Sequence, residues 1–109
     1  MGLRMSTQNE FGLSKELMEE LFYIFTKYSH INKVVIFGNR TKGDYQAYED
    51  IQLCIFGEEI FHDEWYEIIN EIDEIYVPMG FNLLQHHKII KEELKRSIDK
   101  EGIVIYERG

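Results

Sequence analysis

Hydrophobic residues recur along this chain with two different spacings, and the two alternate in a regular order. After Ser14, a residue type that suits the first position of a helix, apolar side chains recur at helical spacing. They predict a helix over about 14–29. Two short runs rich in β-branched and apolar residues, 33–37 and 51–56, each end at a glycine and predict buried strands.

The second half of the chain continues this alternation after a polar segment between Gly38 and Tyr48, which is expected to be a loop. Asp63 is expected to cap a second helix, with Trp65 among the side chains that face the core. The remaining predicted elements are a strand at 81–84, a helix over about 87–100 that ends at Gly102, and a strand at 103–106.

This order of elements predicts an α/β fold, a small mixed β-sheet with helices packed against it. The second and third strands are separated by a helix, so part of the sheet is expected to be parallel. The first two strands lack a helical connection and are expected to be antiparallel or mixed. At 109 residues the chain has room for one core, so we expect a single domain over 13–109 that follows a flexible arm at 1–12.

Composition limits the cellular location and the membrane association expected of the protein. The single cysteine, Cys54, excludes an intrachain disulfide and fits a reducing, cytoplasmic location. No apolar stretch approaches the roughly 20 residues that a membrane helix needs. The first six residues match a loose myristoylation pattern, but nothing else in the chain suggests a lipid anchor, so no membrane partner is expected.

The formal net charge of −8 bears on the class of ligand. An acidic protein is repelled by phosphate backbones unless its basic residues are segregated on one face. The densest basic stretch, 88–96, is interleaved with Glu92 and Glu93 and is interpreted as a solvated helix face. Long nucleic acid is therefore not expected as a substrate.

Three short segments carry candidate chemistry. The first strand runs into Gly38-Asn39-Arg40, followed by two residues and Gly43. The second strand opens with Glu49-Asp50-Ile51-Gln52, and the third reads Phe81-Asn82-Leu83-Leu84. Over about residues 12–107, this arrangement resembles the minimal nucleotidyltransferases of the DNA polymerase β superfamily, which include MntA-type antitoxins.

The resemblance implies a role for each of these positions. In that family the turn reads Gly-Ser-Arg, then two residues and Gly, and it holds the nucleotide. Here Gly38, Asn39, Arg40 and Gly43 occupy it. The family places two acids in a Ser-Asp-x-Asp pattern and a third on a later strand. Asp50 matches the first acid and is the implied metal ligand, whereas Gln52 and Asn82 stand at the other two catalytic positions.

Phosphoryl transfer explains why acids are needed there. Mg²⁺ prefers carboxylate oxygens, and acids at positions i and i+2 of a strand point to the same face. An amide offers a carbonyl oxygen but no charge, and it cannot act as a base at neutral pH. Mg²⁺ and ATP are thus the implied cofactor and ligand, but catalysis is expected to be impaired. Glu49 is expected to point away from Asp50, unless the loop conformation or Asp44 changes the site.

The sequence leaves the origin of the two amides open. Deliberate inactivation commonly replaces aspartate with asparagine, which would explain Asn82. It does not commonly replace aspartate with glutamine, so it does not explain Gln52. The protein is therefore either a natural pseudoenzyme or a deliberately altered enzyme.

Two main hypotheses for function follow, and a third is weaker. The chain transfers AMP from ATP to a protein or small molecule, with reduced activity. Alternatively, it is an inactive antitoxin-like module that binds a HEPN-type ribonuclease partner or a second copy of itself, since an acidic protein complements a basic ribonuclease. The third reading is a structural subunit without a ligand.

For four other features, a purely structural role competes with a functional one. The adjacent pair His86-His87 is interpreted as a helix cap or surface feature rather than a metal site. Trp65 and Cys54 are interpreted as core residues. Tyr45 and Tyr48 either pack locally or stack on a nucleobase or a partner, and the sequence favours neither.

Overall fold

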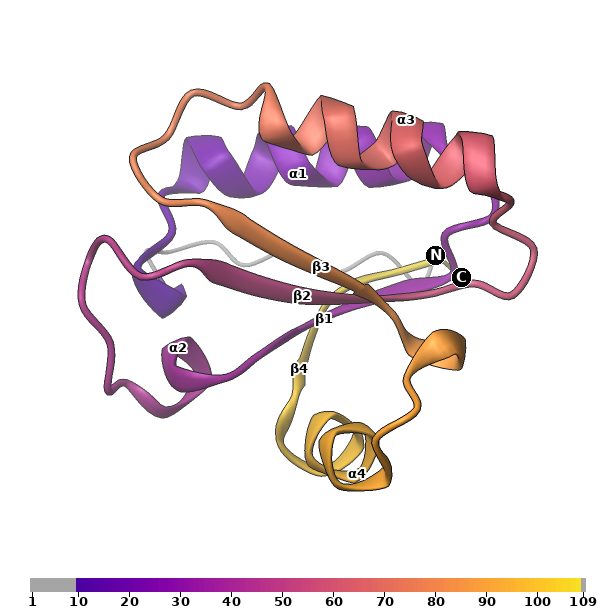
Figure 1. Ribbon diagram of the computed structural model, residues 1–109. Coiled ribbons are helices and arrows are strands. Elements are labelled where there is room, and N and C mark those ends of the chain that lie inside the picture. The colour runs from indigo at the N-terminus through magenta and orange to yellow at the C-terminus, as the bar shows by residue number, and fades with distance from the viewer. Residues whose placement is uncertain (1–9, 109) are drawn as a thin grey trace.

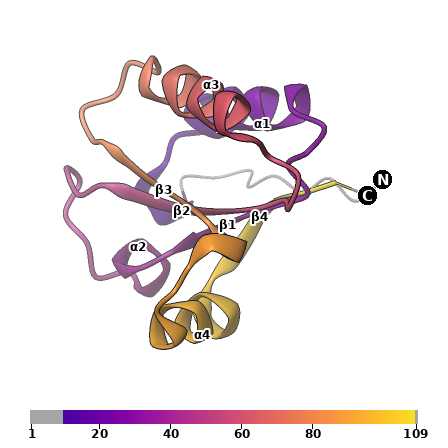
Figure 2. The same ribbon diagram turned by 45° about the vertical axis from the view of Figure 1, so that its right-hand side comes forward.

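The computed structural model describes residues 10–108 (Figures 1 and 2). In chain order the elements are η1 (Glu10–Gly12), α1 (Lys15–Lys27), β1 (Lys33–Phe37), α2 (Asn39–Lys42), β2 (Ile51–Phe56), α3 (His62–Asp73), β3 (Phe81–Gln85), η2 (His86–Lys88), α4 (Glu92–Glu101) and β4 (Ile103–Glu107). Here η denotes a 3-10 helix.

The four strands form one mixed sheet in the order β3-β2-β1-β4. β1 pairs with β2 and with β4 in antiparallel fashion, and β2 pairs with β3 in parallel. The parallel pair is joined through α3, because a parallel connection needs a crossover long enough to return to the same end of the sheet. The predicted α/β class and the predicted orientation of both strand pairs are confirmed.

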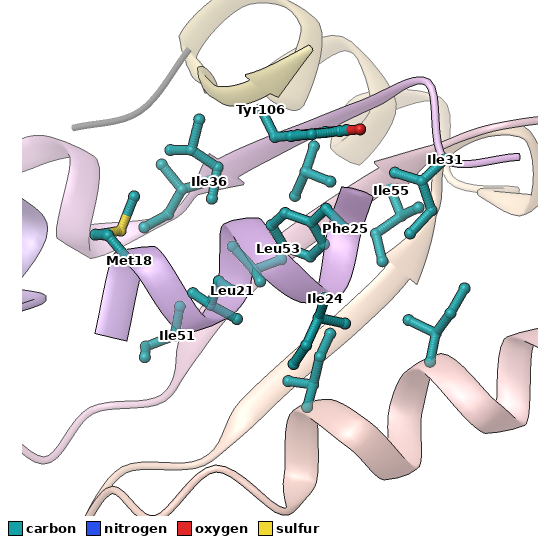
Figure 3. Close-up of a cluster of buried hydrophobic side chains, with 14 of the residues drawn as sticks. Met18, Leu21, Ile24, Phe25, Ile31, Ile36, Ile51, Leu53, Ile55 and Tyr106 are labelled. Atoms are coloured by element: carbon teal, nitrogen blue, oxygen red, sulfur yellow. The ribbon is translucent and has the colours of Figure 1, made fainter. Parts of the chain in front are cut away.

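Alternating strand residues divide the core into two layers. Val34, Ile36, Leu53 and Ile55 point toward α1 and α3, where they meet the apolar face of α1 (Figure 3). On the opposite face, a smaller cluster packs against Ile98 of α4, and its other buried members are Val35, Phe37 and Cys54. Figure 2 shows α1 and α3 together on one side of the sheet and α4 on the other.

Both ends of α1 are satisfied by side chains. The Ser14 hydroxyl oxygen accepts a hydrogen bond from the Leu17 N–H (3.1 Å), as predicted for a helix N-cap. At the other end, the guanidinium of Arg108 donates to the carbonyl oxygens of Tyr28 (3.1 Å) and Ile31 (3.1 Å). The last carbonyls of a helix lack intrahelical partners, so Arg108 stabilises the turn that leads into β1.

Three local predictions are wrong. The expected loop after Gly38 begins with the one-turn helix α2. The residue at the N-cap of α3 is Phe61 rather than Asp63, which lies in the first turn. The last helix begins at Glu92 rather than near 87, because residues 86–88 form a separate 3-10 turn and Ile89 is extended.

Two predictions concern the first residues and the membrane. Most of the predicted arm at 1–12, including the myristoylation pattern at Met1–Ser6, lies outside the described residues; the remainder is η1. Among the described residues, no helix is long and apolar enough to span a bilayer.

Candidate functional site

The sheet register brings the predicted catalytic positions together. Gln52 of β2 is paired with Phe37 on one side and with Asn82 of β3 on the other. Asp50 lies two residues before Gln52, immediately before β2 begins, so their side chains share a face. The strand alternation and the register thus place Asp50, Gln52 and Asn82 in one cluster at the end of the sheet where β1 ends.

Asp50 is held by two donors, one from β3 and one from the residue directly before it. The Gly80 N–H donates to Oδ1 (3.2 Å), and the Asn82 amide nitrogen donates to Oδ2 (3.5 Å). A Cβ at Gly80 would lie 3.0 Å from the same Oδ1, which is tighter than ordinary contact. Gly80 therefore lets the backbone approach the carboxylate closely, since a side chain there would require the Asp50 carboxylate to shift slightly; sequence reasoning missed this role of Gly80. Its position directly before the parallel strand was the available signal.

Gln52 packs over the backbone of Gly38. A Cβ at Gly38 would lie 2.3 Å from Gln52 Nε2. Gly38 also has φ 89° and ψ −158°, a conformation that only glycine adopts without strain. The amide at 52 thus fills the space directly above the turn in which the family resemblance places the nucleotide.

The turn after β1 is closed by its own side chains. The Thr41 N–H and hydroxyl both donate to the Gly38 carbonyl (3.1 and 2.7 Å), and Gly43 ends α2 in a left-handed conformation. Asn39 is exposed and its amide nitrogen donates to Glu49 Oε2 (3.5 Å). The Glu49 carboxylate therefore lies beside the predicted nucleotide turn, a contact that strand alternation did not reveal.

Arg40 is buried, with 3% of its surface exposed, and its guanidinium binds backbone carbonyls. Nε and Nη2 donate to Glu49 O (3.2 and 2.6 Å), Nη2 also donates to Ala47 O (3.1 Å), and Nη1 donates to Phe11 O (2.7 Å). These bonds tie α2 to the loop that leads into Asp50 and to η1. Direct binding of phosphate by this side chain stays a prediction, and it would require some of these bonds to break.

The donor set does not fit a pair of Mg²⁺ ions. The cluster offers one carboxylate, Asp50, and two amides. No group of three or more histidine, cysteine, aspartate or glutamate side chains within residues 10–108 is arranged to hold a metal ion. Mg²⁺ binds mainly through carboxylate oxygens, and a metal pair has its charge offset by several of them. The cluster can supply at most one charged ligand to a metal–nucleotide complex.

The other singled-out residues occupy separate places. Cys54 is fully buried, and this burial raises the pKa of its thiol to about 12, so it remains protonated at neutral pH. His86 stacks on Phe56 (ring centroids 4.0 Å apart), and its Nε2 lies 2.8 Å from Asp99 Oδ1. Trp65 is partly buried against the main core, as predicted.

The two loop tyrosines differ. The ring of Tyr45 packs under the Arg40 guanidinium, with Cζ 4.8 Å from the ring centroid, whereas Tyr48 is 72% exposed. Local packing therefore accounts for Tyr45. Tyr48 remains available as a stacking or contact residue beside Glu49.

Comparisons with known proteins agree with this geometry. The family model described as "Polymerase beta, Nucleotidyltransferase" matches residues 19–109. A structure described as a toxin–antitoxin with AMP-PNP is similar at a TM-score of 0.67 and 10% identity, over 83% of this chain and 73% of that chain. A toxin–antitoxin MntA-HpeT mutant is similar at 0.64 and 8% identity, over 83% and 72%.

A proposed nucleotidyltransferase from Sulfolobus solfataricus is similar at a TM-score of 0.54 and 21% identity, over 92% of this chain and 82% of that chain. At these identities the structural likenesses establish the fold alone. No significant match was found among curated proteins. The family model, which spans most of the chain, establishes more: this protein belongs to the polymerase β nucleotidyltransferase family.

Proposed function

We propose that this chain is an antitoxin-like member of its family, that its capacity for metal-dependent transfer of AMP is lost or severely reduced, and that it acts by binding a partner protein. The observation that carries the proposal is the register pair Gln52–Asn82 beside Asp50. The fold holds these three side chains together, but two of them carry no charge.

In this proposal, the loss of two negative charges at positions 52 and 82 impairs nucleotidyl transfer. Nucleotidyl transfer from ATP develops negative charge on the triphosphate, which bound divalent ions normally offset. Two amides in place of carboxylates weaken the attraction for those ions and remove any candidate base from positions 52 and 82. The Gln52 amide also occupies the space above Gly38, close to the turn where phosphates would lie.

The partner in this proposal is a HEPN-type toxin in a reducing cytoplasm. Two proteins with the same fold were solved as toxin–antitoxin assemblies, which supports this choice. The net charge of −8 favours a basic partner, because complementary charge speeds encounter and disfavours wrong partners. A ribonuclease that binds RNA through a basic surface has the required charge.

Residual nucleotidyl transfer is the second candidate function. Asp50 is exposed, and Gly38 and Gly43 of the turn both have positive φ angles. A single carboxylate with substrate phosphates can bind one Mg²⁺ weakly. In this candidate, ATP and Mg²⁺ still bind, and transfer to an acceptor is slow.

Restoring both acids tests the proposal. We expect the double variant Gln52→Asp/Asn82→Asp to bind ATP in the presence of Mg²⁺ at least about tenfold more tightly than the parent, a difference of ~1.4 kcal/mol. The physical reason is the added charge on one metal-facing cluster. Calorimetric titration of ATP with and without Mg²⁺ measures it, and labelled ATP detects transfer to the protein or to added acceptors.

The matched control is Asn32→Asp/Asn70→Asp, which adds the same two charges at exposed positions and should leave ATP binding unchanged. Mg²⁺-dependent ATP binding by the parent itself, with slow transfer of label to an acceptor, would favour the second candidate. A restored variant that binds no better than the control would refute the assignment of Gln52 and Asn82 to the metal site.

A further inference from the structure

β3 is an edge strand of the sheet. It pairs with β2 alone, so the backbone groups on its other side have no partner within the sheet. α3 lies on one face of the sheet and contacts β3, and the segment after β3 leads to α4 on the opposite face (Figures 1 and 2). Side chains from α3, from β3 and from the segment 88–94 line a depression at this edge.

The depression is a groove of about 340 Å³ with a mainly apolar lining. We call it the β3 groove. Its lining residues are Trp65 from α3; Leu83, Leu84 and Gln85 from β3; Lys88 from η2; Ile89, Ile90 and Lys91 from the segment that follows; and Leu94 from α4. Ile90 is 95% exposed although it borders this groove. A large aliphatic side chain left in water beside an apolar groove marks a contact surface rather than a closed core.

Gln85 adds a polar feature at the end of the strand. Its side chain is 7% exposed, and among the described residues its Oε1 has no hydrogen-bond partner. A buried carbonyl without a donor is unfavourable, and native structures seldom retain one without a reason. Gln85 also lines the groove, so a segment bound along β3 would lie beside this unpaired amide.

The charged residues that line the β3 groove indicate which kind of peptide segment would bind there. The two charged residues that line the groove, Lys88 and Lys91, are both basic and exposed, and neither forms an ion pair with another described residue. They stand out in a chain whose net charge is −8. An extended segment with apolar side chains and acidic flanks matches the lining, the free backbone edge and the two lysines together.

We propose that the β3 groove binds an extended, apolar and acidic segment of a partner protein, which adds to the sheet as a fifth strand beside β3. This inference rests on the proposed function, since it locates the surface through which the partner is held; the acidic segment is a local feature of a partner whose overall charge is basic. A second copy of the chain fits less well, because two molecules that each carry a charge of −8 repel one another.

Tryptophan fluorescence can report binding in the groove, because Trp65 lines the groove and is the sole tryptophan of the chain. The probes are synthetic seven-residue peptides of alternating valine and threonine, with glutamate, glutamine or lysine at both ends. We expect glutamate-flanked peptide to shift Trp65 emission to shorter wavelength in a saturable manner. It should bind at least about tenfold more tightly than lysine-flanked peptide, which corresponds to ~1.4 kcal/mol.

Two variants and one modified peptide make the test specific. Ile90→Glu should weaken binding of the glutamate-flanked peptide at least tenfold, whereas Tyr76→Glu, at a fully exposed position that does not line the groove, should leave it unchanged. Methylating alternate backbone nitrogens of the peptide should abolish binding, because strand addition depends on those donors.

Several outcomes would overturn the proposal. An unchanged Trp65 emission with every peptide at millimolar concentration would remove the groove as a binding site. Binding that survives backbone methylation would exclude strand addition. A concentration-dependent emission shift without peptide, together with dimers in sedimentation, would assign the groove to a second copy. The titration uses no nucleotide or metal, so its failure is distinct from failure of the restored-acid experiment.

Discussion

At the scale of single residues, two arginines use their charge to organise the backbone. Arg108 donates to carbonyls where α1 ends, and Arg40 donates to the carbonyls of Ala47, Glu49 and Phe11. Charge-assisted bonds to carbonyls are stronger than neutral ones, and they satisfy acceptors that helices and loops leave unpaired. Arg40 is the more consequential of the two, because the loop that it holds delivers Asp50 to the site.

Replacing this side chain should destabilise the whole domain. We expect Arg40→Ala to lower the free energy of unfolding by about 2–4 kcal/mol, because four hydrogen bonds to buried or partly buried carbonyls are lost. Arg40→Lys should recover only part of this loss, since an ammonium cannot reproduce the planar arrangement of donors. Urea denaturation followed by circular dichroism measures both variants.

Arg96→Ala is the matched control, since Arg96 is exposed and forms no ion pair with another described residue. It should change stability by less than about 0.5 kcal/mol. If Arg40→Ala were as stable as this control, the loop before Asp50 would be held mainly by other contacts.

At the scale of elements, the layer of α1 and α3 is joined across its surface by Glu71. The carboxylate of Glu71 on α3 accepts hydrogen bonds from the Lys27 ammonium and the Tyr28 hydroxyl at the end of α1. The bond from Lys27 and then that from Tyr28 lower the pKa of Glu71 below its usual value. The two helices thus depend on one ionised side chain in addition to their apolar faces.

This contact should make part of the stability depend on pH. A carboxyl with a lowered pKa in the folded state contributes stability above its unfolded pKa, and this contribution is lost as the pH falls through the folded value. We expect Glu71→Gln to be less stable than the parent at pH 7, by a small amount because the site is partly exposed. The difference should vanish in acid, below the folded pKa of Glu71.

Thermal unfolding of both proteins between pH 7 and pH 2.5 measures this difference. Glu19→Gln, an exposed position on α1, is the control and should follow the parent at every pH. A constant gap between Glu71→Gln and the parent, with no narrowing in acid, would show that the ionised carboxylate is not what joins the helices.

At the scale of the whole molecule, the charge of −8 acts on folding as well as on binding. Like charges held on a small domain repel, and dissolved salt screens that repulsion over about 10 Å at 0.1 M ionic strength. Unfolding separates the charges and relieves the repulsion. The folded state therefore carries an electrostatic penalty that depends on ionic strength.

Raising NaCl from about 0.01 to 0.5 M should raise the melting temperature, because this range shortens the screening length well below the size of the domain. Scanning calorimetry measures the change, and KCl should reproduce it. A melting temperature that falls with either salt would mean that the ion pairs, such as Lys27–Glu71, outweigh the repulsion between acids.

The strands and the directions in which they pair are the parts that the sequence predicted well. Apolar runs and their glycine ends encode β1 and β2 to the residue, and the position of α3 between β2 and β3 encodes their parallel pairing. The boundaries that failed, at Asn39 and at Glu92, lie in polar segments where periodicity is weak. Short helices of this kind are set by tertiary contacts rather than by pattern.

By itself, the sequence determined the alternation of elements and the presence of one acid and two amides at the predicted catalytic positions, because periodicity and residue chemistry are local properties. Tertiary structure decided which carbonyls Arg40 satisfies, that the Gln52 amide covers Gly38, and that apolar side chains from three elements border the edge of β3. These contacts join residues far apart in the chain. No local pattern specifies them, so they exist only once the sheet has formed.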